Sequence, residues 1–213
     1  MSHRRTAALV GNPNAGKSAL FNALTGARQK IANYPGVTVE RKSGRLVLPS
    51  GEPVELTDLP GSYSLHPTSP DEEVTSKVVL GLFPGEAQPD VLVLVLDAAN
   101  LEQHLVFALE VIELGRPTVA ALNMVDLAKR DGLVIDPVAL ASELGVPVIP
   151  TVAVRRKGLA ELTQAIAEAE DRAPEPRHPH SDAVERRVTA QAIAEGAIVT
   201  ETARHRLHSK LDQ

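Results

Sequence analysis

The chain has 213 residues, of which 43% are hydrophobic, 23% charged and 2% aromatic, so its core must be built mainly from aliphatic side chains. A formal net charge of -5 argues against a nucleic-acid-binding surface of the usual basic kind, and the absence of cysteine excludes disulfides and thiolate metal sites. No apolar run reaches the roughly 18 residues of a membrane-spanning helix, so this polypeptide is expected to be soluble and cytoplasmic.

Short apolar runs alternate with amphipathic segments over residues 1–169, which predicts an α/β domain with a mostly parallel sheet and flanking helices. The predicted strands are 6–11, 44–49, 53–58, 91–97, 117–123 and 146–151, with the second and third forming a hairpin. The predicted helices are 16–26, 100–115, 136–145 and 158–169. Asn100 and Asp136 are expected to cap the second and third of these helices.

The character of the chain changes near residue 170. Residues 170–182 contain three prolines and are predicted to be a linker. Apolar residues then recur at helical spacing, which predicts a short all-helical appendage over residues 183–213. The predicted stripe is Val184, Val188, Ala192, Val199, Ala203 and Leu207. Residues 171–213 hold seven Lys and Arg against seven Asp and Glu, so the preceding domain carries the net negative charge.

The most informative motif lies between the first predicted strand and the first predicted helix. Residues 11–18 read Gly-Asn-Pro-Asn-Ala-Gly-Lys-Ser, the G-x-x-x-x-G-K-S pattern of a loop that cradles phosphates. Backbone N–H groups turn inward there, and the helix amino end adds partial positive charge. Lys17 is expected to neutralise the β and γ phosphates and Ser18 to bind Mg²⁺. The alternative is a glycine-rich turn with a surface lysine.

A second motif, Asn-Met-Val-Asp at residues 123–126, predicts which base is bound. It closes a predicted strand, where a nucleotide base lies in an open α/β sheet. The Asp126 carboxylate can accept hydrogen bonds from guanine N1–H and the 2-amino group, and adenine offers neither. Asn123 is expected to brace the loop and the purine edge, and the Ala153 N–H to reach guanine O6. Read alone, the tetrapeptide is also a plausible strand-end turn.

Two further segments are placed to respond to a γ-phosphate. Asp-Leu-Pro-Gly at residues 58–61 ends the second hairpin strand, so Asp58 is expected to hold Mg²⁺ through water and the Gly61 N–H to reach the phosphate. Thr38 precedes that hairpin, where a mobile loop could close and complete the Mg²⁺ shell. Read alone, these are an ordinary turn and a β-branched residue entering a strand.

In this order and spacing the motifs resemble those of a P-loop GTPase (Ras-like) G domain. The chain also resembles, over about residues 6–170, the cytosolic amino-terminal region of the bacterial ferrous iron transport protein B family. The stretches that carry this closer resemblance are 11–26, 33–40, 58–65, 69–72 and 122–126. More loosely, the stretches 192–199 and 204–213 resemble the end of that family's helical domain.

The resemblance implies a slow, Mg²⁺-dependent GTPase over residues 1–169, the G domain, serving as the switch of a ferrous iron uptake transporter. The parent protein would lie in the bacterial inner membrane. The implied partners are GTP and GDP, the parent's own membrane domain and small accessory proteins of iron uptake. Homo-oligomer formation stays open, and no nucleic-acid partner is expected.

The resemblance also implies a set of site residues. The GTP-binding residues are Gly11, Asn12, Pro13, Asn14, Ala15, Gly16, Lys17, Ser18, Ala19, Gly36, Val37, Thr38, Asp58, Leu59, Pro60, Gly61, Asn123, Met124, Asp126, Val152 and Ala153. The catalytic set is Asn14, Lys17, Thr38 and Gly61, and the Mg²⁺ ligands are Ser18, Thr38 and Asp58. The family is associated with potassium stimulation through a phosphate-loop asparagine, which matches Asn14. Its side-chain carbonyl would ligate K⁺ and place positive charge beside the phosphates.

Three positions depart from the usual G-domain pattern. Met124 stands where most G domains carry Lys, and its thioether can pack on the base face as a Lys stem does. Val152 replaces the Ser more often found before the Ala, which puts one loop-bracing hydrogen bond in doubt. Ser62 follows D-x-x-G, where many GTPases have the Gln that orients water. Slow turnover is therefore predicted.

Two other functions stay open. A soluble GTPase acting in ribosome or tRNA maturation would need an RNA-binding appendage, and residues 171–213 are charge-balanced without aromatics. A GTP-gated binding module with negligible catalysis is kept open by Ser62. No iron site is expected at the histidines near the carboxyl end, because surface histidines are common and no matching carboxylates accompany them. These are His178, His180, His205 and His208.

Overall fold

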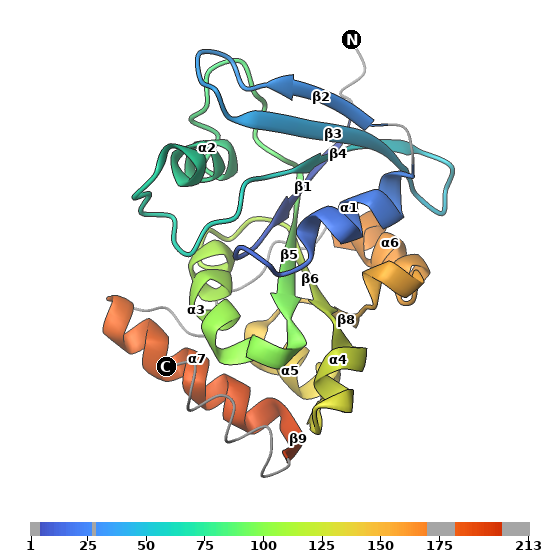
Figure 1. The fold of residues 1–213 in the computed structure, drawn as a ribbon, viewed down its shortest axis with the longest axis vertical. Coiled ribbons are helices and arrows are strands. Elements are labelled where there is room, and N and C mark those ends of the chain that lie inside the picture. Colours follow the sequence, from blue (N-terminus) through green and yellow to red (C-terminus); the bar gives the residue numbers. More distant parts are fainter. Residues whose placement is uncertain (1–4, 27–28, 170–181, 202–213) are drawn as a thin grey trace.

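A computed structural model describes residues 5–26, 29–169 and 182–201, and a seven-stranded sheet runs through its centre (Figure 1). The strands lie in the order β2-β3-β4-β1-β5-β6-β8. Their bounds are β1 Thr6–Val10, β2 Gln29–Asn33, β3 Glu40–Val47, β4 Pro53–Asp58, β5 Val91–Asp97, β6 Thr118–Asn123 and β8 Val148–Pro150. β3 pairs antiparallel with both β2 and β4, and the other neighbours are parallel. The predicted mostly parallel sheet with its hairpin is confirmed.

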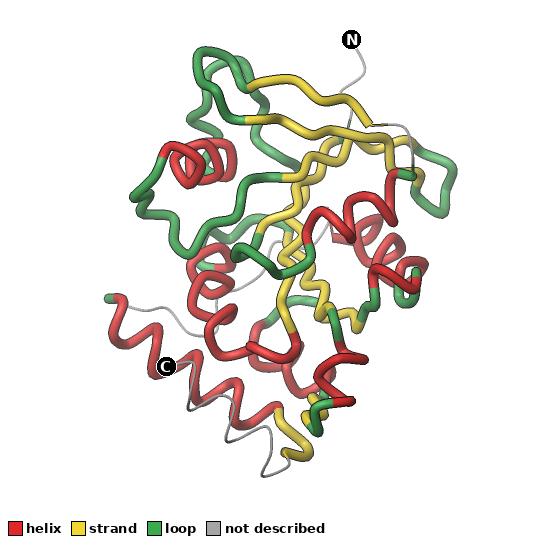
Figure 2. Tube along the Cα trace, viewed as in Figure 1, coloured by secondary structure: helices red, strands yellow, loops and turns green. Residues whose placement is uncertain are grey.

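Helices cover both faces of the sheet, as Figure 2 shows in red and yellow. Their bounds are α1 Lys17–Thr25, α2 Pro70–Val79, α3 Leu101–Ile112, α4 Val125–Arg130, α5 Pro137–Leu144, α6 Leu159–Glu168 and α7 Ala183–Ala197. Two short 3₁₀ turns, η1 Ala98–Asn100 and η2 Ala153–Arg155, follow β5 and β8. Among the described residues, no helix is both long and apolar enough to cross a membrane.

The continuous apolar run of β5 is explained by burial on both faces of the sheet. Leu92, Leu94 and Leu96 point into the core that α2, α3, α5 and α7 cover. Their neighbours Val91, Val93 and Val95 point into the opposite core beneath α1 and α6. Because helices cover both faces of the sheet, the connecting loops lie at the ends of the strands, where their residues can form a site.

Parallel pairing gathers several loops that carry predicted site residues at one edge of the sheet. Leu9 near the end of β1 lies in register with Asp58 at the end of β4, and Asp97 at the end of β5 with Asn123 at the end of β6. The loops after β1, β4, β5, β6 and β8 therefore meet at the carboxyl edge, where open α/β sheets bind ligands.

The helix caps are partly as predicted. The side chain of Asp136 accepts hydrogen bonds from the Val138 and Ala139 N–H groups, as expected for a cap. Asn100 precedes α3, but its side chain makes no capping bond; its amide N–H donates to Asp97 Oδ2 over 2.7 Å. The expected side-chain cap at Asn100 is therefore wrong.

The predicted stripe of the carboxyl-terminal helix is also wrong. Val184 and Val188 are 73% and 64% exposed, whereas α7 packs on α3 and α5 through smaller residues. The buried face consists of Ala190, Ile193, Ala194 and Ala197. The helix ends at Ala197, and β9 (Ile198–Glu201), which contains Val199, pairs antiparallel with β7 (Leu133–Ile135). The prediction of an all-helical appendage over residues 183–213 is therefore wrong. Residues 170–181 of the predicted linker, Ala203, Leu207 and the four carboxyl-terminal histidines lie outside the described residues.

Candidate functional site

The phosphate loop connects β1 to α1 and is packed tightly against the rest of the sheet edge. A Cβ added at Gly11 would lie 2.5 Å from the Val95 carbonyl oxygen. Gly16 has a φ of 84°, in the left-handed region that favours glycine, and a Cβ there would overlap the Asn123 amide. These positions require glycine, so the loop backbone approaches its neighbours as closely as the sequence pattern predicts.

Lys17 closes the loop from within. Its Nζ donates to the Gly11 and Asn12 carbonyl oxygens over 2.9 and 2.8 Å, and the residue is only 8% exposed. Burial lowers the pKa of Lys17 to about 8, while the nearby Asp58 carboxylate opposes that shift. A buried ammonium beside a helix amino end is an electropositive environment suited to an anion.

Ser18 and Asp58 meet at the mouth of the loop. The Ser18 hydroxyl donates to Asp58 Oδ2 over 2.8 Å. The other carboxylate oxygen, Oδ1, is buried without a partner among the described residues. Burial raises the pKa of Asp58, while the Ser18 hydrogen bond and Lys17 act to lower it. A hydroxyl and an unsatisfied carboxylate oxygen are hard ligands, so these two residues fit Mg²⁺.

Thr38 and its neighbours lie on an exposed turn between β2 and β3. The turn is closed by the Tyr34 N–H, which donates to the Val39 carbonyl oxygen over 2.9 Å. Among the described residues, no hydrogen bond joins Thr38 to Ser18 or Asp58. The structure thus brings two of the three predicted Mg²⁺ ligands into direct contact, and the third stands on a separate segment.

The segment after β4 rests on the phosphate loop. A Cβ added at Gly61 would lie 2.9 Å from Pro13, and the Ser62 N–H donates to the Gly11 carbonyl oxygen over 3.2 Å. Ser62 is fully buried, and its hydroxyl donates to the Ser64 carbonyl oxygen over 2.6 Å. The Ser62 hydroxyl is therefore occupied by a hydrogen bond to the backbone of its own segment.

Glu110 on α3 holds the same segment from the opposite side. Its carboxylate accepts hydrogen bonds from the Ser64 hydroxyl at 3.0 and 3.1 Å and from the Leu65 N–H at 2.6 Å. It also pairs with Arg186 of α7 over 3.1 Å. Sequence analysis missed this residue, although an acidic side chain inside the apolar run of α3 was a usable signal.

Asn123 ties three loops together at the carboxyl edge of the sheet. Its Nδ2 donates to the Ala15 carbonyl oxygen over 3.2 Å. Its Oδ1 accepts from the Thr151 hydroxyl over 3.3 Å and from the Ala153 N–H over 3.2 Å. The brace expected of Asn123 is present between loops. The bracing hydroxyl missing at Val152 is supplied one residue earlier by Thr151, which sequence analysis did not single out.

Met124 and Asp126 lie directly after Asn123 in the chain, at the start of α4. Met124 takes a left-handed φ of 59°, and its terminal methyl group lies 3.3 Å from where a Gly16 Cβ would stand. The Asp126 side chain is 23% exposed and pairs with Arg155 Nε at 3.5 Å. The carboxylate is thus near the surface, beside the loop that carries Ala153.

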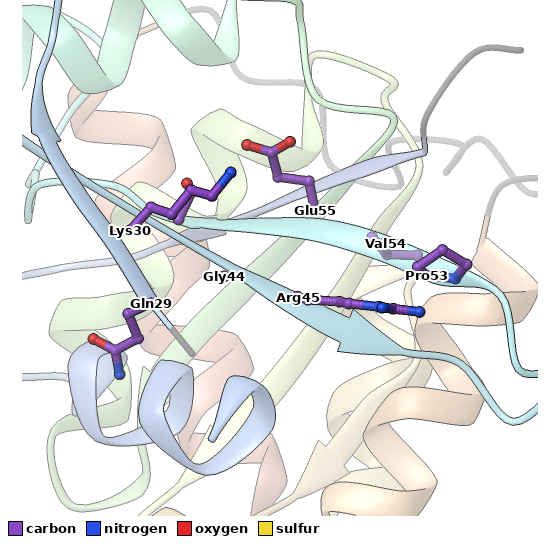
Figure 3. Close-up of a pocket in the computed structure, with 8 residues that line it drawn as sticks. Gln29, Lys30, Gly44, Arg45, Pro53, Val54 and Glu55 are labelled. Atoms are coloured by element: carbon purple, nitrogen blue, oxygen red, sulfur yellow. The ribbon is translucent and has the colours of Figure 1, made fainter. Parts of the chain in front are cut away.

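The hollow in Figure 3 lies away from this constellation, on the outer strands β2 to β4. It has a volume of about 480 Å³ and is lined by residues 29–30, 43–45 and 53–55. None of these belongs to the loops that carry the predicted site residues, so the hollow is not assigned to the site.

A family model described as Ferrous iron transport protein B matches residues 5–166 of the chain. The Fe(2+) transporter FeoB of Legionella pneumophila (strain Paris) is 48% identical over 104 residues, covering 46% of this chain and 13% of that protein. The Salmonella typhimurium (strain LT2) FeoB is 49% identical over 104 residues, covering 47% and 13%. The matched part is therefore a small fraction of these relatives' length.

Solved structures of the same family share the fold. The cytosolic domain of L. pneumophila FeoB matches with a TM-score of 0.74 and 42% identity, over 85% of this chain and 70% of that one. The cytosolic domain of the T. maritima FeoB iron transporter in its GMPPNP form gives 0.81 and 30%, over 92% and 99%. An S. thermophilus NFeoB mutant bound to GDP gives 0.70 and 40%, over 78% and 61%.

Proposed function

Because the chain belongs to the ferrous iron transport protein B family, we propose that its G domain is the GTP-binding and GTP-hydrolysing switch of a ferrous iron transporter. The observation that carries this proposal is the Asn123 link, which joins the phosphate loop to the two loops expected to read guanine. The GMPPNP and GDP forms of the T. maritima and S. thermophilus proteins support nucleotide binding at this site. The rest of the parent protein would supply the membrane domain, with this domain facing the cytosol.

The phosphates would lie in the loop of residues 11–18, with Lys17 as the cation that neutralises them. Asp126 would accept from the guanine N1–H and 2-amino group, and the Ala153 N–H would donate to O6. The αL conformation of Met124 supports a thioether position between the base and the phosphate loop. Each role rests on placement at the carboxyl edge of the sheet.

Mg²⁺ would be held by Ser18 and by Asp58, the latter through water, with Thr38 joining when its turn closes over the γ-phosphate. When bound, the ion would neutralise charge on the transferring phosphoryl group. The unpartnered Asp58 Oδ1 supports this assignment. Gly61 would donate its N–H to the γ-phosphate from the segment that already rests on Pro13.

Potassium stimulation would act through Asn14. This residue is exposed, takes a left-handed φ of 65°, and its side chain forms no hydrogen bond among the described residues. An exposed amide carbonyl at the loop is available to a monovalent cation beside the phosphates. The cation would contribute the positive charge that an arginine finger contributes in other GTPases.

Slow turnover is supported by Ser62, whose buried hydroxyl is bonded to the Ser64 carbonyl and so is not directed at an attacking water. The same observation favours a second candidate function, a GTP-gated binding module with negligible hydrolysis. In that case nucleotide binding alone would drive the switch.

The deciding experiment compares GTP hydrolysis in KCl and NaCl for the wild type and Asn14→Ala, with nucleotide binding measured in parallel. Acceleration by K⁺ that disappears in Asn14→Ala while binding persists supports the potassium-stimulated GTPase. Equally slow hydrolysis in both salts supports the binding module instead. Equal affinity of the wild type for GTP and ATP would overturn both candidate functions.

A further inference from the structure

We infer that Arg155 is a positioning residue for guanine recognition, acting through the carboxylate of Asp126. The inference rests on the proposed function, because it concerns the residue expected to read the base. Arg155 Nε lies 3.5 Å from Asp126 Oδ2, and this contact joins the loop after β8 to the start of α4. Neither the motif nor the family resemblance points to position 155.

The backbone that carries Arg155 is held firmly. Val152 and Lys157 exchange two backbone hydrogen bonds of 3.1 and 3.2 Å, which close the loop around η2. Gly158 has a φ of 75°, and a Cβ there would overlap the Pro150 carbonyl oxygen. On its other side the loop is fixed by the Ala153 N–H on Asn123. Arg155 therefore projects from a loop whose position is set by the same amide that braces the base site.

The contact leaves the carboxylate able to bind the base. A carboxylate has about four acceptor positions, so Oδ2 can stay paired with the Arg155 guanidinium while the carboxylate accepts from guanine. Pairing through one oxygen also restricts rotation of the carboxylate, which keeps both oxygens available along one edge of the base. When guanine covers Asp126 it removes water from the carboxylate, and the neighbouring Arg155 charge offsets part of that loss.

Other charges near Asp126 do not replace Arg155. Arg130 at the end of α4 feels Asp126 electrostatically, but its guanidinium is bonded to Asp131 over 3.0 and 3.3 Å. Arg156, the next residue along the loop, is exposed with a φ of 53° and forms no ion pair with Asp126 among the described residues. Arg156 is therefore a charge-matched control.

The size of the effect follows from exposure. The Arg155 side chain is 64% exposed, so solvent screens the pair and its contribution is that of a surface ion pair. Losing it should weaken GDP binding about two- to fivefold at low salt, with a smaller change at high salt. Because the carboxylate then rotates more freely, the contact with the 2-amino group should suffer most.

The test measures the affinity of the wild type, Arg155→Ala, Arg155→Lys and Arg156→Ala for GDP, IDP and ADP, IDP being the analogue without the 2-amino group. Arg155→Ala is expected to lower both the GDP affinity and the GDP-to-IDP preference. Arg155→Lys should recover part of the affinity, and Arg156→Ala should match the wild type. In an Asp126→Ala background, adding Arg155→Ala should cause no further loss of GDP affinity.

Each outcome separates the inference from the proposed function. A wild type that binds ADP as well as GDP overturns guanine recognition itself. A wild type that prefers GDP, together with an Arg155→Ala protein of equal or tighter GDP affinity, overturns the positioning role alone. An equal loss for GDP and IDP would also overturn it, because a general electrostatic effect does not depend on the 2-amino group.

Discussion

Arg186 on α7 and Glu110 on α3 form an ion pair of 3.1 Å, with side chains only 12% and 8% exposed. The second arm of the same guanidinium binds Glu113 Oε2 over 3.0 Å. Glu110 in turn holds Ser64 and Leu65, in the segment that follows Asp58 to Gly61. One buried carboxylate therefore connects the carboxyl-terminal helix with a segment that rests on the phosphate loop.

Replacing Arg186 with Ala should lower the free energy of unfolding by about 2–3 kcal/mol, because it leaves the Glu110 charge buried without its cation. Urea denaturation measures the change. Arg186→Lys should recover only part of it, since an ammonium cannot reach two carboxylates with a planar fork. The exposed neighbour Arg187 is the control, and Arg187→Ala should stay within about 0.5 kcal/mol of the wild type. Equal losses at both positions would contradict the prediction.

The stability of the protein should fall as the solution is acidified through the range where histidine titrates. His104 is 5% exposed, and its Nδ1 accepts from the Asp97 N–H over 3.3 Å. Burial lowers the pKa of His104 below its ordinary 6.5; the Asp97 charge opposes this and Lys17 adds to it. As the pH falls below the ordinary pKa of histidine, the unfolded chain therefore protonates His104 more fully than the folded chain does.

The free energy of unfolding should therefore decrease below pH 6.5, with His104 contributing a slope of at most about 1.4 kcal/mol per pH unit. His104→Gln should show a shallower acid slope than the wild type, whereas His66→Gln, at an exposed position, should keep it. Denaturant titrations at several pH values from about 5 to about 8 measure the slopes of both variants. Parallel curves for the wild type and His104→Gln would refute the assignment.

Removing the Asn123 amide should damage both stability and nucleotide binding. Asn123→Ala loses three hydrogen bonds and leaves buried partners unsatisfied, so we expect a loss of at least about 2 kcal/mol and no measurable GDP binding. Thr151→Val removes only one of these bonds and should cost about 1 kcal/mol while GDP still binds. Thr151→Ser keeps the hydroxyl and should retain GDP binding, with a stability loss of about 1 kcal/mol from the deleted buried methyl group. Unaltered GDP affinity in Asn123→Ala would contradict the proposed brace.

Gly158 and Gly115 form a matched pair for testing the closed loop after β8. Their φ values are 75° and 66°, so alanine carries a similar backbone strain of about 1–2 kcal/mol at each. A Cβ at Gly115 meets nothing within 4 Å, whereas one at Gly158 overlaps the Pro150 carbonyl oxygen. Thermal or urea unfolding should show Gly158→Ala to be the more destabilising by at least about 2 kcal/mol. A smaller difference would mean that the loop can relax.

Much of the fold could be predicted because the decisive elements are strongly patterned. The run at β5 is apolar at every position and needs burial on both faces, and the glycines of the phosphate loop occupy places where a Cβ does not fit. β2 was missed because Gln29–Asn33 lies at an exposed sheet edge, where pairing with β3 rather than burial forms the strand. α2 was missed although Ser69 accepts the Glu72 N–H and Pro70 opens the helix.

The errors near the carboxyl end have a different origin. A period alone cannot say which face of a helix is buried, and α7 packs its small residues closely on α3 and α5 while its valines face outward. Within the site, the motif pattern located Asn123, but the hydroxyl of Thr151 was not predicted. Its role depends on how β6 and β8 are set side by side, which only the assembled sheet determines.

The Asn123 link also constrains the order in which the protein can form. One side chain joins residues 15, 151 and 153, which are 108, 28 and 30 positions away along the chain. Contacts of such long range form only after the intervening loops have closed, and that closure first costs conformational entropy. A nascent chain that has not yet emerged past Ala153 therefore cannot complete the Asn123 link. Under the proposed function, tight nucleotide binding would therefore be a late event in synthesis, possible only once the sheet is complete.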